Sequence, residues 1–381
     1  MTSRTHLLVE ETDPRRRGHE RGRRLAPEIA RGWRTYSQLF EVAAAARGVT
    51  LDVPALALRT LAATRAWAPE LAAEIEGVAD GAGVPLWVAA ALNARTEILA
   101  VAGTPRAGEC STVVRVGDRT LGGQTWDWHE ELADGWHVQT VRGDEVAFTG
   151  ITEHGILAKI GLNEAGVGVL FNILGHVDDG ADGVPVHLVA RRVLGGARSY
   201  AEAVAILTAA PVSASTVVTV VTADRAACVE LSPAGAAVIP PGPVTPEGPH
   251  GSDDQGGSDG VGGSDGAGWL VHTNHFVAPA LAEGEFRGRA EPETYDRERL
   301  LAGRIRDGHP FDDAGDLAAL LTAHPGDGAE VCCHAPADGR LGTRWASLAT
   351  IVVEPGAGRL MLHDGTPCSA RPSTWTTVTP G

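Results

Sequence analysis

Long apolar runs and positive charge are both scarce in this sequence. No window approaches the roughly 20 apolar residues that a membrane-spanning helix requires, and the formal net charge of the 381 residues is −16. Lys159 is the only lysine, so arginine supplies nearly all of the cationic side chains. Because nucleic acids and anionic membranes are bound through a basic face, we expect neither as a partner.

Cysteines are few, and their number is odd. The five are widely spaced, at Cys110, Cys228, Cys332, Cys333 and Cys368. The N-terminal residues show neither the apolar core nor the small-residue cleavage site of a secretory leader. Because disulfide frameworks belong mainly to secreted proteins, we expect no disulfides and a cytoplasmic location.

The pattern along the chain favours a layered α+β fold. Apolar spacings of three and four predict helices over 69–83 and 85–101, within a helical first hundred residues. Segments rich in β-branched residues predict strands over 111–116, 136–143, 145–151, 155–162, 166–174, 215–223, 226–232, 345–355 and 358–365. Further helices are predicted over 185–196, 199–210, 295–305 and 312–323. Strands in blocks with helices between the blocks are typical of α+β rather than doubly wound proteins.

One segment, residues 240–268, lacks apolar periodicity and is rich in Gly, Ser and Asp. Its repeated "GGSDG" lacks the nonapeptide spacing and the apolar anchor of a calcium-binding repeat. We therefore interpret it as a flexible insertion.

Cys110 admits two interpretations. Free cysteines are often small buried hydrophobic residues without reactivity. However, Cys110 follows a Gly-Glu pair and begins a predicted strand, a position that suits an N-terminal nucleophile released by cleavage of the Glu109–Cys110 bond. The new α-amine, with an unperturbed pKa of roughly 7.7–8.0, would then serve as the base for the thiol on the same residue.

Several motifs carry a family resemblance in the same order along the chain. They are "PELAAEIEGVADGAG", "LNARTEIL", Cys110 with "GGQTWDW", "ITEHGILAKIGLNEAGVGVLFNIL", "GVPVHLVARRVL", "VHTNHF", "TRWASLATIVVEP" and "GTPC". The sequence resembles the acyl-coenzyme A:6-aminopenicillanic acid acyltransferase (isopenicillin N acyltransferase) family of autoproteolytic N-terminal nucleophile (Ntn) enzymes. The resemblance implies a four-layer αββα sandwich, self-cleavage before Cys110, and a heterodimer of a helical α chain (1–109) with a catalytic β chain (110–381).

The resemblance also implies roles for individual residues. Cys110 matches the nucleophile, and Asn274 matches an asparagine that donates to the oxyanion. Asp127 matches an aspartate that orients the amine or the substrate, although from the residues alone it could be a turn residue that caps a strand. Arg344 matches an arginine that would hold Asp127 bidentately or favour the thiolate; without the resemblance it is an ordinary solvated arginine.

Two positions depart from the penicillin enzyme. Its residue before the nucleophile is glycine, whereas Glu109 stands here; the larger, charged side chain is expected to slow cleavage and to raise the pKa of Cys110. Trp128 and His129 stand where that enzyme has two aromatic residues near its acyl pocket. We therefore expect both to contact substrate, in a pocket of different polarity, and we do not carry over the penicillin substrate.

The resulting hypothesis is an enzyme that forms an acyl-thioester on Cys110. It would be an amide hydrolase or an N-acyltransferase, with acyl-coenzyme A as a possible co-substrate but with no cofactor and no metal. Its partners would be a small-molecule amide, amine or acyl thioester and its own second chain, and a role in specialised metabolism is implied by the resemblance alone.

Two other classes of protein stay open. One is a non-catalytic binding protein that keeps the fold. The other is a metal-dependent amidohydrolase that uses scattered histidines such as His129, His137 and His154. A metal pair of His272 and His275 is disfavoured, because no third ligand is obvious.

Overall fold

The computed structural model describes residues 4–103, 110–244 and 268–381. Within these residues the strands form two sheets, A and B. Sheet A has the order β1 (His6–Val9), β4 (Trp136–Val141), β5 (Phe148–Glu153), β6 (Ile160–Asn163), β7 (Gly168–Ile173), β8 (Thr216–Val221), β9 (Ala226–Ser232) and β10 (Gly235–Ile239). Only the β1–β4 pair is parallel among these described strands.

Sheet B is antiparallel throughout the described chain. Its order is β11 (Gly268–His272), β2 (Thr112–Val116), β3 (Leu121–His129), β12 (Trp345–Glu354), β13 (Arg359–Asp364) and β14 (Trp375–Val378). Gly268, the last residue of the insertion predicted over 240–268, begins β11. Residues 245–267 lie outside the described part of the chain, so the flexibility expected of that insertion stays a prediction.

Helices cover the outer face of each sheet. The first group is α1 (Pro14–Arg24), α2 (Ala26–Arg47), α3 (Val53–Trp67), α4 (Pro69–Ala82), α5 (Leu86–Asn93) and α6 (Arg95–Ala102). The others are α7 (Val186–Gly196), α8 (Tyr200–Thr208), α9 (Pro279–Ala282), α10 (Arg287–Ala290), α11 (Glu293–Arg306) and α12 (Ala314–Leu321). In the described part of the chain, none of them is both long and apolar enough to cross a bilayer.

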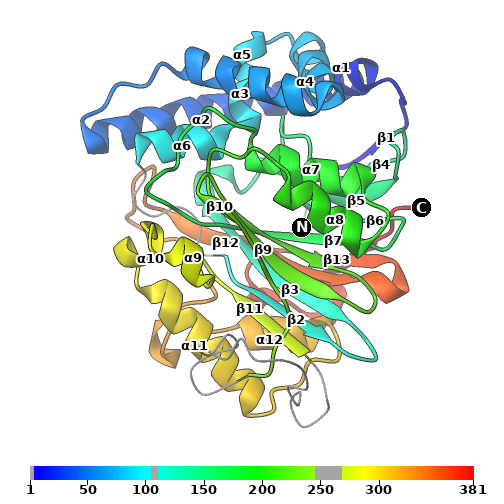
Figure 1. The fold of residues 1–381 in the computed structure, drawn as a ribbon, viewed down its shortest axis with the longest axis vertical. Coiled ribbons are helices and arrows are strands. Elements are labelled where there is room, and N and C mark those ends of the chain that lie inside the picture. The colour runs from blue at the N-terminus through cyan, green and yellow to red at the C-terminus, as the bar shows by residue number, and fades with distance from the viewer. Residues whose placement is uncertain (1–3, 104–109, 245–267) are drawn as a thin grey trace.

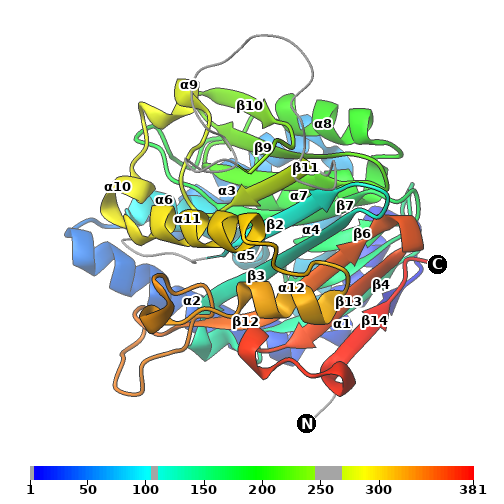
Figure 2. The same cartoon turned by 90° about the horizontal axis from the view of Figure 1, so that it is seen from below.

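The four-layer arrangement is visible in Figure 1 and, from below, in Figure 2. Helices α7 and α8 pack on sheet A, the two sheets pack face to face, and α11 and α12 pack on sheet B. Helices α1–α6 lie beyond α7, at the sheet A side of the molecule. The predicted α+β class and αββα layering are therefore confirmed.

Two details differ from the sequence prediction. The helix expected over 85–101 is two helices, α5 and α6, which meet at Ala94. The side chain of Asn93 in that break bonds Gly155 O at 2.9 Å and Leu157 N at 3.1 Å, so the helix end fastens a loop of sheet A. The segment expected to be helical before residue 110 also supplies strand β1, whose four residues are too short a run for periodicity to reveal.

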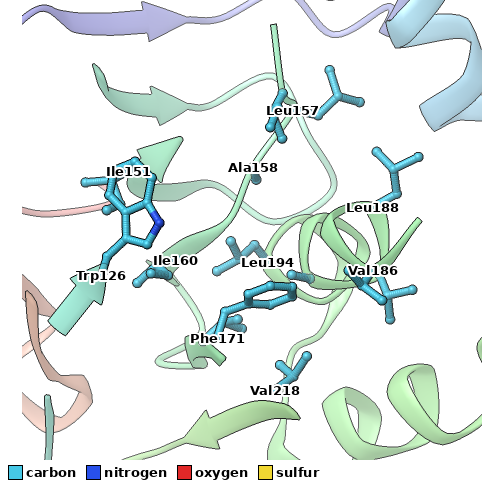
Figure 3. Packing of buried hydrophobic residues seen from close by; sticks show 14 of the residues in the cluster. Trp126, Ile151, Leu157, Ala158, Ile160, Phe171, Val186, Leu188, Leu194 and Val218 are labelled. Carbon is cyan, nitrogen blue, oxygen red and sulfur yellow. The ribbon is translucent and has the colours of Figure 1, made fainter. Parts of the chain in front are cut away.

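The core fills the space between the layers. Trp126 of β3 lies against Ile151 and Ile160 of sheet A, and Phe171 of β7 faces Leu194 of α7 (Figure 3). Every residue of β4, β5 and β8 is buried. Their sequences are rich in β-branched and aromatic residues, which is why these segments were predictable as strands.

Glycines set the distance between the first helices and the rest of their layer. A Cβ on Gly18 of α1 would collide with Glu74 O, and a Cβ on Gly77 of α4 would collide with Arg15 O. Only glycine permits two helix backbones to approach this closely. The approach brings the arginines of α1 against Glu74.

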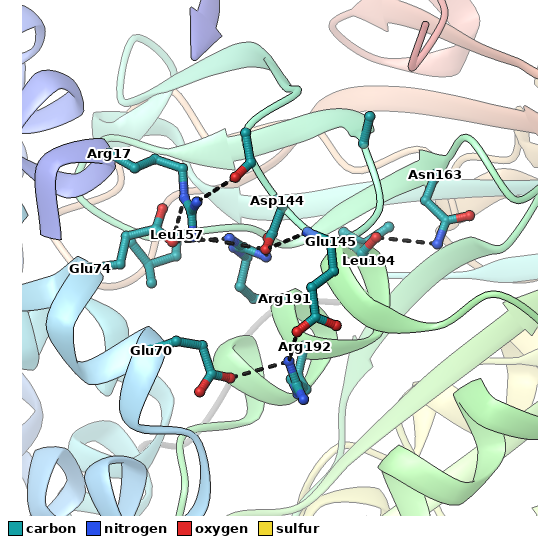
Figure 4. A network of polar contacts seen from close by, with 12 residues as sticks. Arg17, Glu70, Glu74, Asp144, Glu145, Leu157, Asn163, Arg191, Arg192 and Leu194 are labelled. Atoms are coloured by element: carbon teal, nitrogen blue, oxygen red, sulfur yellow. Dashed lines mark hydrogen bonds and ion pairs between the residues drawn. The ribbon is translucent and has the colours of Figure 1, made fainter. Parts of the chain in front are cut away.

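A buried network of charges joins the first helices to sheet A and α7 (Figure 4). Glu74 accepts from Arg17 at 3.1 Å, Arg21 at 3.3 Å and Arg191 at 2.9 Å. Arg191 also pairs with Asp144 at 2.5 Å. The three arginines lower the pKa of Glu74 to about 2, against the opposing effect of its burial. Because a buried charge is tolerated only with partners, this network holds the segment before residue 110 in place.

Glu97 of α6 makes a second connection, between the segment before residue 110 and α7. Its Oε1 accepts from the backbone N–H of Val186, the first residue of α7, at 2.9 Å. Burial raises the pKa of this carboxyl to about 7. Its other oxygen has no hydrogen-bond partner among the described residues, as suits a carboxyl that carries a proton.

We predict that Glu97→Gln removes a pH dependence of stability. Because the folded pKa of about 7 exceeds the ordinary 4.5, the folded protein holds a proton that the unfolded chain has already released. The free energy of unfolding should fall as the pH rises between these two values, by up to about 3 kcal/mol. Glutamine keeps the acceptor for Val186 and should abolish that fall. Urea unfolding across this pH range, with both chains in a Cys110→Ala background, measures it.

The exposed Glu41→Gln variant is the matched control and should retain the wild-type pH dependence. An equally steep fall in Glu97→Gln would show that another group is responsible.

Candidate functional site

Cys110 lies buried just before β2, with 5% of its surface exposed. Because β2 pairs antiparallel with β3, the thiol reaches the backbone of Asp127. The Asp127 N–H donates to Sγ at 3.4 Å, and Sγ lies 3.8 Å from Asp127 O. Two of the predicted site residues are therefore neighbours across adjacent strands.

The carbonyl of Cys110 is held by two buried side chains that sequence reasoning missed. Asn172 of β7 donates to it from Nδ2 at 2.9 Å, and Arg297 of α11 donates from Nη1 at 3.2 Å. Arg297 also donates to Ser111 Oγ at 3.1 Å. Sheet A, sheet B and α11 thus meet at the residue that carries the thiol. The one available signal was an asparagine inside the apolar run 166–174.

Asn274, the predicted oxyanion donor, follows strand β11 and belongs to the same hydrogen-bonded set. Its Oδ1 accepts from Arg297 Nη2 at 3.0 Å, and its Nδ2 donates to Ile173 O at 2.8 Å. An amide nitrogen carries two N–H donors, and among the described residues the bond to Ile173 O uses one of them. Arg297 links Asn274 to the carbonyl of Cys110 and sets the distance between them.

The thiol is held in its neutral form in the intact chain. Burial, followed by the charge of Asp127, raises the pKa of Cys110 to about 11. The Asp127 N–H, Lys159 and Arg297 act in the opposite direction, but they are outweighed. A thiol in this state is a weak nucleophile, so rapid reaction with a substrate needs a base beside it.

Beside the thiol lies a buried cluster centred on Glu153. This carboxylate accepts from Arg95 at 2.6 Å and from Lys159 at 2.8 Å, and the hydroxyl of Tyr36 also donates to it. The Trp128 Nε1–H donates to the Tyr36 oxygen at 2.9 Å. Burial lowers the pKa of Lys159 to about 8. Two of these residues, Arg95 and Tyr36, come from helices before Cys110, so those helices support the site directly.

A cavity of about 300 Å³ opens next to these residues. Trp128 lines it, and so does Ile173, whose carbonyl accepts from Asn274. A contact between Trp128 and substrate stays a prediction. Its wall is largely apolar, with polar groups from Arg47, His176, Asp179 and Arg287. An apolar cavity with a few polar groups is typical of a small-molecule site.

His129, whose ring lies 5.1 Å from that of Trp128, is not among the residues that line this cavity. Its ring lies 4.0 Å from that of Trp345, and burial lowers its pKa to about 3, which keeps the imidazole neutral. Of the two residues expected to contact substrate, Trp128 lines the cavity and His129 does not.

The contact expected between Arg344 and Asp127 is wrong. The Arg344 guanidinium donates to Glu130 instead. The register of β12 against β3 explains this, since Glu130 N donates to Arg344 O at 2.8 Å and places the arginine three residues beyond Asp127. The function predicted for Arg344 at the thiolate stays untested.

The histidines of the metal-hydrolase hypothesis do not form a ligand set. The rings of His137 and His154 are stacked 5.1 Å apart, and burial lowers the pKa of both. His272 and His275 each pair with a carboxylate, Glu230 at 2.9 Å and Glu298 at 3.0 Å respectively. Over the described ranges, no group of three or more potential ligands includes any of these histidines or His129.

Glu109, the residue before the predicted scissile bond, lies outside the described residues. The last described residue before the gap, Gly103, lines the cavity. The described structure thus stops at Gly103 on the cavity wall and resumes at Cys110.

Comparison with solved structures finds distant likenesses. The Caenorhabditis elegans ortholog of N-acylethanolamine-hydrolyzing acid amidase is 16% identical, with 65% of this chain and 93% of that chain covered and a TM-score of 0.41. A conjugated bile acid hydrolase from Clostridium perfringens is 12% identical, with 71% of this chain and 92% of that chain covered and a TM-score of 0.43. Penicillin V acylase from Agrobacterium tumefaciens is 13% identical, with 67% of this chain and 83% of that chain covered and a TM-score of 0.40. The family match described next is independent of these three structures.

One family model matches part of this chain. Residues 114–300 match the acyl-coenzyme A:6-aminopenicillanic acid acyl-transferase family. The matched span includes Asp127, Asn172, Asn274 and Arg297, and it begins four residues after Cys110. Over this segment, just under half of its length, the chain is similar to the acyl-coenzyme A:6-aminopenicillanic acid acyl-transferase family.

Proposed function

We propose that this protein is a cysteine Ntn enzyme that forms an acyl-thioester on Cys110. The observation that carries the proposal is the environment of the thiol. It is buried against Asp127, and two side chains hold its own carbonyl. The chain neighbours Trp128 and Ile173 of Asp127 and Asn172 line a cavity suited to a small molecule. A cysteine that only filled the core would not need charged and amide groups around it.

The first step of the proposal is self-cleavage before Cys110. The thiol sulfur attacks the carbonyl carbon of Glu109, the thiol proton passes to the amide nitrogen, and the C–N bond breaks, so that this nitrogen becomes the α-amine of Cys110. Water then hydrolyses the thioester, which releases the carboxylate of Glu109 and restores the thiol. The new α-amine supplies the base that the intact site lacks.

In turnover the α-amine takes the thiol proton while the sulfur attacks the carbonyl of an amide or an acyl thioester. The second N–H of Asn274 stabilises the oxyanion, Arg297 fixes Asn274, and Asp127 orients the amine. The leaving amine or thiol departs with the proton. An acceptor amine or water then attacks the acyl-thioester, so the enzyme is an N-acyltransferase that takes acyl groups from acyl-coenzyme A, or an amide hydrolase.

The two pieces stay together after cleavage in this proposal. The buried contacts of Glu74 with Arg191 and of Arg95 with Glu153 cross the cleavage point. Separating the chains would leave these charges without partners, which costs several kcal/mol for a buried pair. The product is therefore an α/β heterodimer. We also propose a cytoplasmic location, because all five cysteines are free.

We predict that the purified wild-type protein gives two masses under denaturing conditions, for residues 1–109 and 110–381, that co-elute as one species in native buffer. Cys110→Ala should give a single intact chain. The buried Cys228→Ala variant is the control and should cleave like the wild type. An intact wild type whose Cys110 resists alkylation at neutral pH would contradict the proposal and favour a non-catalytic binding protein.

We predict that Asn172→Ala slows self-cleavage at least tenfold, because the carbonyl of Cys110 loses one of its two donors and the thiol its fixed position. Loss of this buried hydrogen bond should also lower the free energy of unfolding by about 1–3 kcal/mol. The time course of intact mass measures the cleavage rate.

The control for that experiment is Asn163→Ala. Asn163 is similarly buried, and its amide holds Leu194 O and Ala197 O at the C-terminal end of α7. It should be destabilised to a similar degree and still cleave at the wild-type rate. If both variants slow cleavage equally, Asn172 acts through stability and not by positioning Cys110.

The nature of the acceptor can be measured on the cleaved enzyme. A radiolabelled acyl-coenzyme A should label the 110–381 chain through an acyl-thioester that hydroxylamine releases, and Asn274→Ala should slow labelling by about 10²–10³. Product formation that depends on an added amine indicates transfer. Release of free acid at a rate independent of amine indicates hydrolysis. Absence of labelling by any thioester or amide donor tested would contradict both.

A further inference from the structure

Four potential metal ligands come together on the sheet B side of the molecule, outside the residues used above. They are His324, Cys332, His334 and Cys368, and their ligand atoms all lie within 4.8 Å of one another. His324 follows α12, Cys332 and His334 precede β12, and Cys368 follows β13 in a short 3-10 turn, η4 (Pro367–Ser369). Three separate chain segments thus bring nitrogen and sulfur atoms to one point.

The distances suit a tetrahedral ion. His334 Nε2 lies 3.4 Å from Cys332 Sγ and 3.4 Å from Cys368 Sγ. Zinc bonds of about 2.3 Å to sulfur and about 2.0–2.1 Å to nitrogen place tetrahedral S and N ligands about 3.5 Å apart. The rings of His324 and His334 lie 5.3 Å apart at 35°, so the two imidazoles approach the point side by side.

Groups behind the ligands also fit a metal site. His324 Nδ1 lies 3.8 Å from Asp327 Oδ2, and the same carboxylate accepts from the His324 backbone N–H at 2.9 Å. Thr366 Oγ1 lies 3.4 Å from Cys368 Sγ. Metal-bound histidines usually have a carboxylate or carbonyl behind the second ring nitrogen, which fixes the ring.

We propose that His324, Cys332, His334 and Cys368 bind one structural Zn²⁺ ion. Two thiolates and two imidazoles are a donor set that zinc prefers, and four protein ligands close its coordination. A closed site has no position for a reactive water, so the ion stabilises the fold and performs no step at Cys110. No metal was expected from the sequence, in which these four ligands lie up to 44 positions apart.

The place of the cluster in the fold gives the ion a purpose. The chain from Ala323 to Arg344 contains no strand and only the short turn η2 (Pro325–Asp327). Its backbone is tied to the end of α12, where the N–H groups of Val331 and Cys332 both donate to Ala323 O, at 3.0 and 2.9 Å. An ion at these four ligands would fix this irregular segment to both α12 and the turn after β13.

The segment continues directly to the candidate active site. Cys333, next to the ligand Cys332, donates its N–H to Ser347 Oγ at 3.1 Å and accepts from Ser347 N at 3.0 Å. Ser347 of β12 lies opposite Asp127 of β3. The proposed ion therefore stabilises the backbone that supports Asp127, without contact with the thiol of Cys110.

The test is the metal content of the untagged full-length chain, measured by inductively coupled plasma mass spectrometry after reconstitution with zinc in reducing buffer. We expect about one zinc per chain. Cys368→Ser, at a partly exposed ligand, and His334→Ala, at an exposed ligand, should each lower the affinity for zinc at least tenfold. Cobalt in place of zinc should give intense thiolate-to-metal absorption in the wild type and weaker absorption in Cys368→Ser.

Cys333→Ser is the matched control, because its thiol adjoins the cluster but bonds Trp345 O at 3.3 Å. It should bind zinc like the wild type. Failure of the reduced wild-type chain to retain zinc or cobalt would overturn the proposal, as would a disulfide between Cys332 and Cys368 that re-forms in the presence of zinc. Equal zinc content in the wild type and both ligand variants would also overturn it, since the ion would then be bound elsewhere.

Discussion

The carboxylate of Glu153 is the group on which the structure near the candidate site depends. It is fully enclosed, and three donors, from Arg95, Lys159 and Tyr36, satisfy it. A buried charge of this kind is strongly destabilising unless all its partners are in place. Two of those partners belong to helices before Cys110, so the helical segment and sheet A can reach their final arrangement only together. The single lysine of the sequence is used here and not at the surface.

This cluster also reaches the cavity, through the bond from Trp128 to Tyr36. The indole ring is held at one end by a residue of α2, while its strand carries Asp127 beside the thiol. A rigid wall next to the reactive atom favours productive placement of a substrate. The segment before Cys110 is therefore an integral part of the site, and a proposed cleavage at residue 109 would leave that wall intact.

The sequence was sufficient for most of the fold and for one part of the site. Buried strands and amphipathic helices leave periodic patterns that predict the layers. The neighbours Cys110 and Asp127 could be expected because they lie on adjacent strands close in sequence. Asn172 and Arg297 could not, because they reach Cys110 from 62 and 187 residues away. For Arg344 a contact with Asp127 was one of two expected roles, and sequence alone does not show the three-residue offset that pairs it with Glu130.

The high pKa of the thiol gives the proposed self-cleavage a physical role. In the intact chain Cys110 has a pKa of about 11 and is neutral at ordinary pH, so it reacts slowly with solutes. Cleavage would add an amine with a pKa of roughly 7.7–8.0 within bonding distance of the sulfur, and an ammonium beside the sulfur favours the thiolate. The same burial that suppresses the thiol in the precursor also strengthens the interaction of thiolate and ammonium in the product, because the local dielectric is low. Burial of Cys110 thus serves both states: it delays reaction before cleavage and supports it afterwards.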